Sequence, residues 1–134
     1  MNLWTSRINY SGLDRVDISR AGCDRARKAG GATPGEFLAP SAALVFPTLA
    51  AMKAAPHALA RQAVWADYSA AYRLEMLASY KARRPEWDAF LQRERATIVC
   101  YCASDLHGVL RCHRLLAAGY LARLGATYCG EVNG

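Results

Sequence analysis

An apolar run at residues 96–102, Ala-Thr-Ile-Val-Cys-Tyr-Cys, follows directly on the charged segment at 92–95. Short β-branched runs with polar flanks are typical of strands in the centre of a parallel sheet, where both faces are covered. After a loop, residues 111–125 have the composition of a helix that ends at a glycine, and residues 126–130 that of a last strand. Strand, helix and strand over this length predict one βαβ unit with two parallel strands.

The segments before this unit predict two further strands and three helices. Residues that favour strands fill 3–10, and apolar and polar residues alternate at 15–19. Helical composition covers 40–54 and 58–82, and Pro85 favours the first turn of a third helix. With 134 residues the chain suits a single domain. The predicted fold is α/β: a small, Rossmann-like, three-layer domain with a short, mainly parallel sheet flanked by helices.

The helix predictions carry two expectations about packing. Large side chains recur at steps of three or four along 58–82, which predicts a buried core face rather than a cofactor site. The residues of this stripe are Trp65, Tyr68, Tyr72, Met76 and Tyr80. Gly119, inside the last helix, is expected to allow that helix to pack closely on the sheet.

Residues 20–36 are glycine-rich and basic and have almost no large apolar side chain, which predicts a long, flexible, exposed basic loop. Loops of this length in compact domains are often binding loops or lids. A disordered loop without a functional role fits the composition equally well. Arg25, Arg27 and Lys28 would contribute to function only if the loop binds a ligand.

The composition is that of a folded globular protein, with 53% hydrophobic and 21% charged residues. The formal net charge of +6 favours anionic partners, such as a small phosphate-bearing molecule, nucleic acid or an acidic protein. The arginines are spread along the chain without a consecutive basic block, so a solvated basic surface explains the charge at least as simply.

The sequence predicts neither a membrane anchor nor secretion. The longest apolar stretch, 37–52, is shorter than a bilayer span and contains Pro40 and Pro47. The start of the chain has no long apolar segment behind a basic one, so no signal peptide is expected. Five cysteines are an odd number, which does not suit a disulfide framework, and the expected location is the reducing cytoplasm.

The candidate site lies at the end of the predicted central strand. In open parallel sheets, ligands bind outside the carboxyl ends of the strands, where helix N-termini point inward. The chemically active residues that follow the strand are Cys102, Asp105, His107, Cys112, His113 and Arg114. Because side chains alternate along a strand, Cys100 lies one pleat deeper than Cys102 and is expected to be a packing residue. Cys102 is the more reactive candidate.

Zinc is one interpretation of this cluster, with Cys102, Cys112 and either His107 or His113 as ligands, with or without Cys100. The spacing differs from that of the usual paired zinc ligands. Adjacent residues such as Cys112 and His113 also project in different directions from a helix. The sequence therefore gives zinc little support, and no cofactor is expected.

A second interpretation makes Cys102 or Cys112 a nucleophilic or redox-active thiol, activated by the helix N-terminus and Arg114. Phosphatase-like and rhodanese-like loops require an arginine six positions after the strand-end cysteine. Gly108 stands at that position after Cys102, so this chemistry is disfavoured.

A third interpretation is an anion pocket without covalent chemistry. Arg114 and the helix N-terminus would hold a phosphate or carboxylate, and His113 would donate a hydrogen bond or move a proton. A purely structural alternative is open as well, in which Arg114 pairs with an internal acid and His113 is satisfied in the core.

A strand-end Cys102-Ala103, a short loop and a Cys112-His113-Arg114 helix start together resemble the YeaO-like family of domains of unknown function. Ser6-Arg7 in the first strand, Val16-Asp17-Ile18 in the second and the aromatic helix extend the resemblance over most of the chain. The resemblance implies a compact Rossmann-like fold but no established reaction. It also implies a pocket formed by Arg7, Cys102, Cys112, His113 and Arg114.

The leading hypothesis is a small cytoplasmic protein that binds a phosphate-bearing or nucleotide-like ligand at this place, with possible cysteine and histidine chemistry. The candidate catalytic residues are Cys102, Cys112 and His113, and the candidate ligand-binding residues are Ser6, Arg7, Asp105, His107 and Arg114. One alternative is a non-enzymatic phage or mobile-element accessory protein that binds nucleic acid or an acidic host protein. A zinc-binding module is the other.

Overall fold

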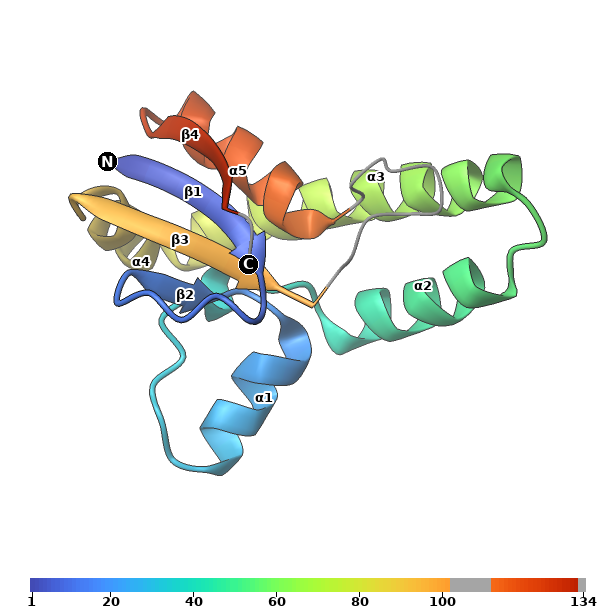
Figure 1. The fold of residues 1–134 in the computed structure, drawn as a ribbon, viewed down its shortest axis with the longest axis horizontal. Helices are drawn as coiled ribbons and strands as arrows, with labels where there is room; N and C mark the ends of the chain where they lie inside the picture. Colours follow the sequence, from blue (N-terminus) through green and yellow to red (C-terminus); the bar gives the residue numbers. More distant parts are fainter. Residues whose placement is uncertain (102–111, 133–134) are drawn as a thin grey trace.

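The computed structural model describes residues 1–101 and 112–132 (Figure 1). Its elements are β1 (Asn2–Arg7), β2 (Arg15–Asp17), α1 (Arg20–Lys28), the 3-10 turn η1 (Glu36–Leu38), α2 (Ala42–Ala54), α3 (Ala58–Ala82), α4 (Arg84–Leu91), β3 (Arg95–Cys100), α5 (His113–Arg123) and β4 (Thr127–Val132). The strands form one parallel sheet in the order β2-β3-β1-β4, flanked by helices. The predicted Rossmann-like α/β fold is therefore confirmed.

The register of the sheet brings the ends of all described strands to one side. Arg7 at the end of β1 pairs with Cys100 at the end of β3, and Asp17 at the end of β2 pairs with Val99. Val132 ends β4 on the other side of β1. We call this side of the sheet the carboxyl edge. Because α1 follows β2 and α5 follows β3, both helices begin there.

The first two strands are shorter than the sequence predicts, because the chain turns early. After β1, the amide of Tyr10 donates to the carbonyl of Arg7 over 3.2 Å, and the Tyr10 hydroxyl donates to Asp14 over 2.6 Å. After β2, the side chain of Asp17 accepts hydrogen bonds from the amide and the hydroxyl of Ser19. Ser19 is thereby placed as the N-cap of α1.

The prediction of a long flexible loop at 20–36 is wrong, since its first half is helix α1. The Ser19 hydroxyl caps this helix by accepting from the amide of Gly22 over 3.0 Å. Basic residues in the last turn interact favourably with the negative end of the helix dipole. A Cβ atom at Gly22 would collide with the carboxylate of Asp17, so the glycine allows the close approach of α1 to the end of β2. The Ser19 cap and the basic last turn, rather than a stripe of apolar side chains, stabilise this helix.

The predicted core stripe on α3 is confirmed. Tyr68, Tyr72 and Met76 are buried, while Trp65 and Tyr80 are partly buried and pack against the same core. Figure 1 shows α3, α4 and α5 behind the strands, and α1 at the β2 end of the sheet. Among the described helices, none is long and apolar enough to cross a membrane.

The expectation for Gly119 is wrong, because a Cβ atom there would meet nothing within 4 Å. Gly119 faces solvent. After the buried His113 and Arg114, the buried face of α5 continues with Ala117, Ala118 and Leu121. Small alanine side chains therefore let α5 lie close to the sheet.

We predict that Ser19→Ala lowers the free energy of unfolding by about 1–2 kcal/mol, because α1 loses its cap and Asp17 loses a donor. Denaturation by urea, followed by circular dichroism, measures the change. Ser11→Ala is the matched control, since Ser11 is exposed, and its effect should stay within about 0.5 kcal/mol. Equal effects of the two substitutions would contradict the assignment of the cap.

Candidate functional site

Two cysteines meet inside the carboxyl edge. Cys100 ends β3, Cys112 precedes α5, and the two are joined as a disulfide. Both side chains are fully buried in the core cluster. Cys100 is therefore buried as expected, but it is also a covalent partner of Cys112, which the sequence pattern did not indicate.

The backbone at Cys112 explains how its sulfur turns toward the strand. Cys112 is the N-cap of α5 and has an extended conformation, with φ of −152° and ψ of 146°. The argument that Cys112 and His113 must diverge assumes that both are helical, and it is wrong because only His113 is. The Sγ of Cys112 lies 4.0 Å from Nδ1 of His113. One possible ligand atom from each of Cys100, Cys112 and His113 lies within 4.8 Å of the others.

His113 is held in one tautomer by the end of β2. Its Nε2 lies 2.9 Å from the carbonyl oxygen of Ile18, which can only accept a hydrogen bond. Nε2 therefore carries the proton, and Nδ1 keeps a lone pair on the side of Cys112. Burial lowers the pKa of His113 to about 4, although the Ile18 hydrogen bond acts in the opposite direction. The imidazole is neutral around pH 7 and packs on the ring of Tyr72.

Arg114 has no exposed surface and is satisfied within the protein. Its Nε and Nη2 donate to the carboxylate of Glu131 in β4 over 3.2 and 2.7 Å. Its Nη1 donates to Sγ of Cys100 over 3.1 Å. Burial acts to raise the pKa of Glu131, but the hydrogen bonds from Arg114 and Thr5 help to bring it below the usual value. This pairing with an internal acid is the arrangement that the structural alternative anticipated.

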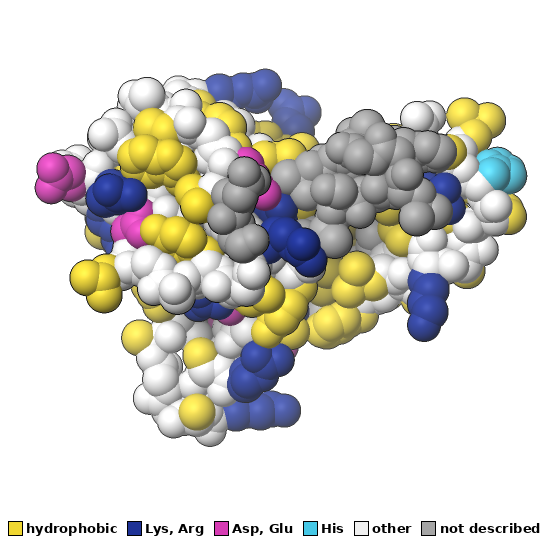
Figure 2. Space-filling model, viewed as in Figure 1, with side chains coloured by type: hydrophobic (Ala, Val, Ile, Leu, Met, Phe, Trp, Pro, Cys, Tyr) yellow, Lys and Arg dark blue, Asp and Glu magenta, His cyan; other side chains and the backbone are white. Residues whose placement is uncertain are grey.

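The first strand brings one buried and one exposed residue to the edge. Ser6 is buried, and its hydroxyl donates to the carbonyl of Val132 over 3.2 Å, so it ties β1 to β4. Arg7 is exposed at the end of β1. Arg25 of α1 donates to the hydroxyl of Tyr101 over 2.9 Å, just beyond β3. Figure 2 shows Lys and Arg side chains beside the sheet end and again on α1.

Three of the predicted site residues lie outside the described part of the chain: Cys102, Asp105 and His107. Of the others, Cys112, His113 and Arg114 form one buried cluster with Cys100. We call these four residues the sulfur cluster. Arg7 lies outside it on the exposed side of the edge.

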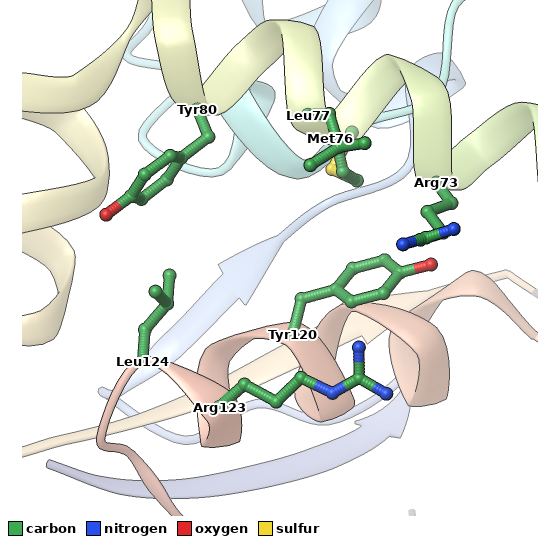
Figure 3. Close-up of a pocket in the computed structure, with 7 residues that line it drawn as sticks. All are labelled: Arg73, Met76, Leu77, Tyr80, Tyr120, Arg123 and Leu124. Atoms are coloured by element: carbon green, nitrogen blue, oxygen red, sulfur yellow. The ribbon is translucent and has the colours of Figure 1, made fainter.

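A concave feature lies between α3 and α5, outside the sulfur cluster (Figure 3). It is a groove of about 180 Å³ lined by Arg73, Met76, Leu77, Tyr80, Tyr120, Arg123 and Leu124. The two arginines stand at the Tyr120 end, while Tyr80 and Leu124 lie at the other. The sequence pattern predicted a core face on α3 but gave no sign of this groove.

The parallel sheet flanked by helices makes this a small Rossmann-like α/β protein. Buried sulfur, imidazole and guanidinium groups lie at the carboxyl edge of the sheet. The family model DUF488-N3a, described as the active DUF488-N3 subclade, matches residues 3–125. The chain belongs to this family of domains of unknown function. The predicted resemblance to YeaO-like domains is confirmed. No curated protein and no solved structure matches the chain.

We predict that Glu131→Gln lowers the free energy of unfolding by about 2 kcal/mol at pH 7, because buried Arg114 loses its counter-charge. The pKa of Glu131 lies below its ordinary value of 4.5 in the folded protein. Its contribution is therefore complete above pH 4.5 and is lost as the pH falls through the lowered pKa. The gap between wild type and variant should close in acid, as urea denaturation at several pH values would measure.

Asp88→Asn is the control for this prediction. Asp88 pairs with Arg84 over 3.0 Å, but both side chains are more than half exposed. Its loss should cost at most about 0.5 kcal/mol. A Glu131→Gln variant as stable as Asp88→Asn would contradict the structural role of the buried pair.

Proposed function

We propose that the protein binds a small phosphate-bearing anion, with nucleotides as the first class of ligand, at the carboxyl edge of its sheet. The observation that supports this most is the convergence of parallel strand ends, two helix starts and the exposed cation of Arg7. Open parallel sheets bind ligands at this edge because loops diverge there and helix amides point toward it.

The two helix starts at the edge differ in how their amides are satisfied. The Ser19 hydroxyl caps α1 by accepting from the amide of Gly22. In contrast, Cys112 makes no side-chain cap for α5. Where the N-cap side chain accepts no bond, the positive end of the helix dipole can favour a bound anion. The phosphate is therefore expected on the exposed side of this helix start, where Arg7 lies, rather than among the buried first residues of α5.

Arg7 and Arg25 supply positive charge on the exposed side of this place. Arg25 keeps its guanidinium near the end of β3 through Tyr101. Arg114 has a different role, because its donors already engage Glu131 and Cys100. It fixes the start of α5 rather than serving as the first contact of a ligand. A bidentate or charge-assisted bond from an arginine to phosphate stabilises binding more than a neutral hydrogen bond does.

The arrangement supports binding more directly than catalysis. The sulfurs of Cys100 and Cys112 are buried, so neither presents a nucleophile to a ligand on the exposed side. His113 donates to a carbonyl and turns its lone pair toward sulfur, so it is not placed to take a proton from such a ligand.

Ion pairing among the arginines favours a small ligand over an extended nucleic acid. In the described part of the chain, acidic side chains lie within 4.0 Å of six arginines: Arg20, Arg27, Arg83, Arg84, Arg95 and Arg114. These pairs offset the charge of six of the chain's 17 basic residues locally. A nucleic-acid surface would need a continuous row of free cations along the phosphate backbone.

Calorimetric titration with ADP and with inorganic phosphate tests the proposal. We predict saturable binding by the wild type and a loss of roughly 10–100-fold in affinity for Arg7→Ala, the value of one charge-assisted contact. Arg93→Ala is the matched control, because Arg93 is also exposed but stands before the start of β3, at the opposite edge. Its affinity should match the wild type.

Two results would contradict the proposal. One is the absence of saturable binding of either ligand to the wild type. The other is an equal loss in Arg7→Ala and Arg93→Ala, which would indicate diffuse attraction to a basic surface. Retardation of DNA or RNA by the protein, abolished by moderate salt, would favour the nucleic-acid alternative.

A further inference from the structure

We propose that Cys100, Cys112 and His113 bind a zinc ion when the Cys100–Cys112 disulfide is reduced. This inference concerns the buried interior of the carboxyl edge and does not depend on anion binding at its exposed side. In this proposal, Cys100, Cys112 and His113 of the sulfur cluster serve as metal ligands and not only as packing residues.

The ligand set and its placement fit zinc. Two thiolates and an imidazole are the donors that zinc prefers, at about 2.3 Å for sulfur and about 2.0 Å for nitrogen. The three donor atoms already lie within 4.8 Å of one another. The Cα atoms of the two cysteines are 7.7 Å apart, which leaves room for an ion between the reduced sulfurs. Cys100 lies at the end of β3 and Cys112 at the start of α5, and both residues pack in the hydrophobic core.

The hydrogen bonds around these residues orient them as metal ligands require. A ligating histidine usually donates its second ring N–H to a carbonyl or carboxylate, which fixes the tautomer. His113 does this through Nε2 and the Ile18 carbonyl, and its Nδ1 lone pair is directed to the side of Cys112. Arg114 donates to Sγ of Cys100 over 3.1 Å and so would stabilise a thiolate there.

The charges of the reduced, metal-bound cluster balance. A phosphine reductant takes the oxygen of one water molecule to form its oxide and passes two electrons and two protons to the disulfide, which yields two thiols. Zinc then displaces both protons, so the doubly charged ion is matched by two thiolates beside a neutral imidazole. Arg114 is matched by Glu131. No net charge is left in the buried cluster, which removes the main cost of placing an ion there.

Metal analysis of the full chain tests the site. The protein is reduced with a phosphine, freed of metal by a chelator, and titrated with zinc against a chromophoric competitor. We predict one tightly bound zinc per chain after reduction and none in protein whose disulfide is left intact. Zinc-edge X-ray absorption should show at least two sulfurs at about 2.3 Å and a nitrogen at about 2.0 Å.

Cys112→Ser should lower zinc affinity at least about 100-fold, because one thiolate is lost from the ligand set. Cys129→Ser is the matched control, since Cys129 is a free, exposed cysteine, and its affinity should equal that of the wild type. Arg7→Ala should also keep its zinc, which separates this site from the anion site. Circular dichroism establishes that each variant is folded.

The proposal is overturned if the reduced wild type holds less than about one-tenth of a zinc per chain. It is also overturned if the absorption spectrum shows no sulfur around the metal, or if folded Cys112→Ser binds zinc as the wild type does. Should Cys112→Ser fail to fold, the sulfur count from the wild-type spectrum decides alone.

Discussion

The buried pair between Arg114 and Glu131 is the interaction on which the carboxyl edge depends. A guanidinium without exposed surface must keep its hydrogen bonds, because an unpaired buried charge costs several kcal/mol. Arg114 meets this requirement with Glu131 at the end of β4 and Cys100 at the end of β3. The pair therefore fixes the start of α5 against two strands. Cys112 and His113, which stand immediately before Arg114, are brought to the sheet with it.

The edge has an inner and an outer part with different chemistry. The sulfur cluster of Cys100, Cys112, His113 and Arg114 is buried and internally satisfied, which suits a metal or a disulfide. Arg7 and Arg25 are exposed and face solvent, which suits an anion. Among the described residues of this edge, the cysteine and histidine side chains lie inside, and the arginines Arg7 and Arg25 lie outside.

Periodicity is enough to predict the sheet and the long helices, and the predicted βαβ unit brings Cys112, His113 and Arg114 to the carboxyl edge. The sequence does not predict the helix at 20–28, because a serine cap and terminal charges stabilise it, while its glycine and basic residues resemble a loop. The sequence does not identify Glu131 as the partner of Arg114, because the two residues meet only after the chain has returned from α5 into β4. The sequence argument that separates Cys112 from His113 fails, because the extended N-cap conformation of Cys112 leaves no mark in the sequence.

Mapping of amide chemical shifts by NMR during a titration with ADP tests the central claim most directly, since it locates the ligand on the sheet. The account predicts saturable shifts at the carboxyl edge, at Arg7, Asp17 and the first turn of α5, with none at Arg93 and Glu94 before β3. Shifts that do not saturate, or that are spread equally over both edges, would contradict it.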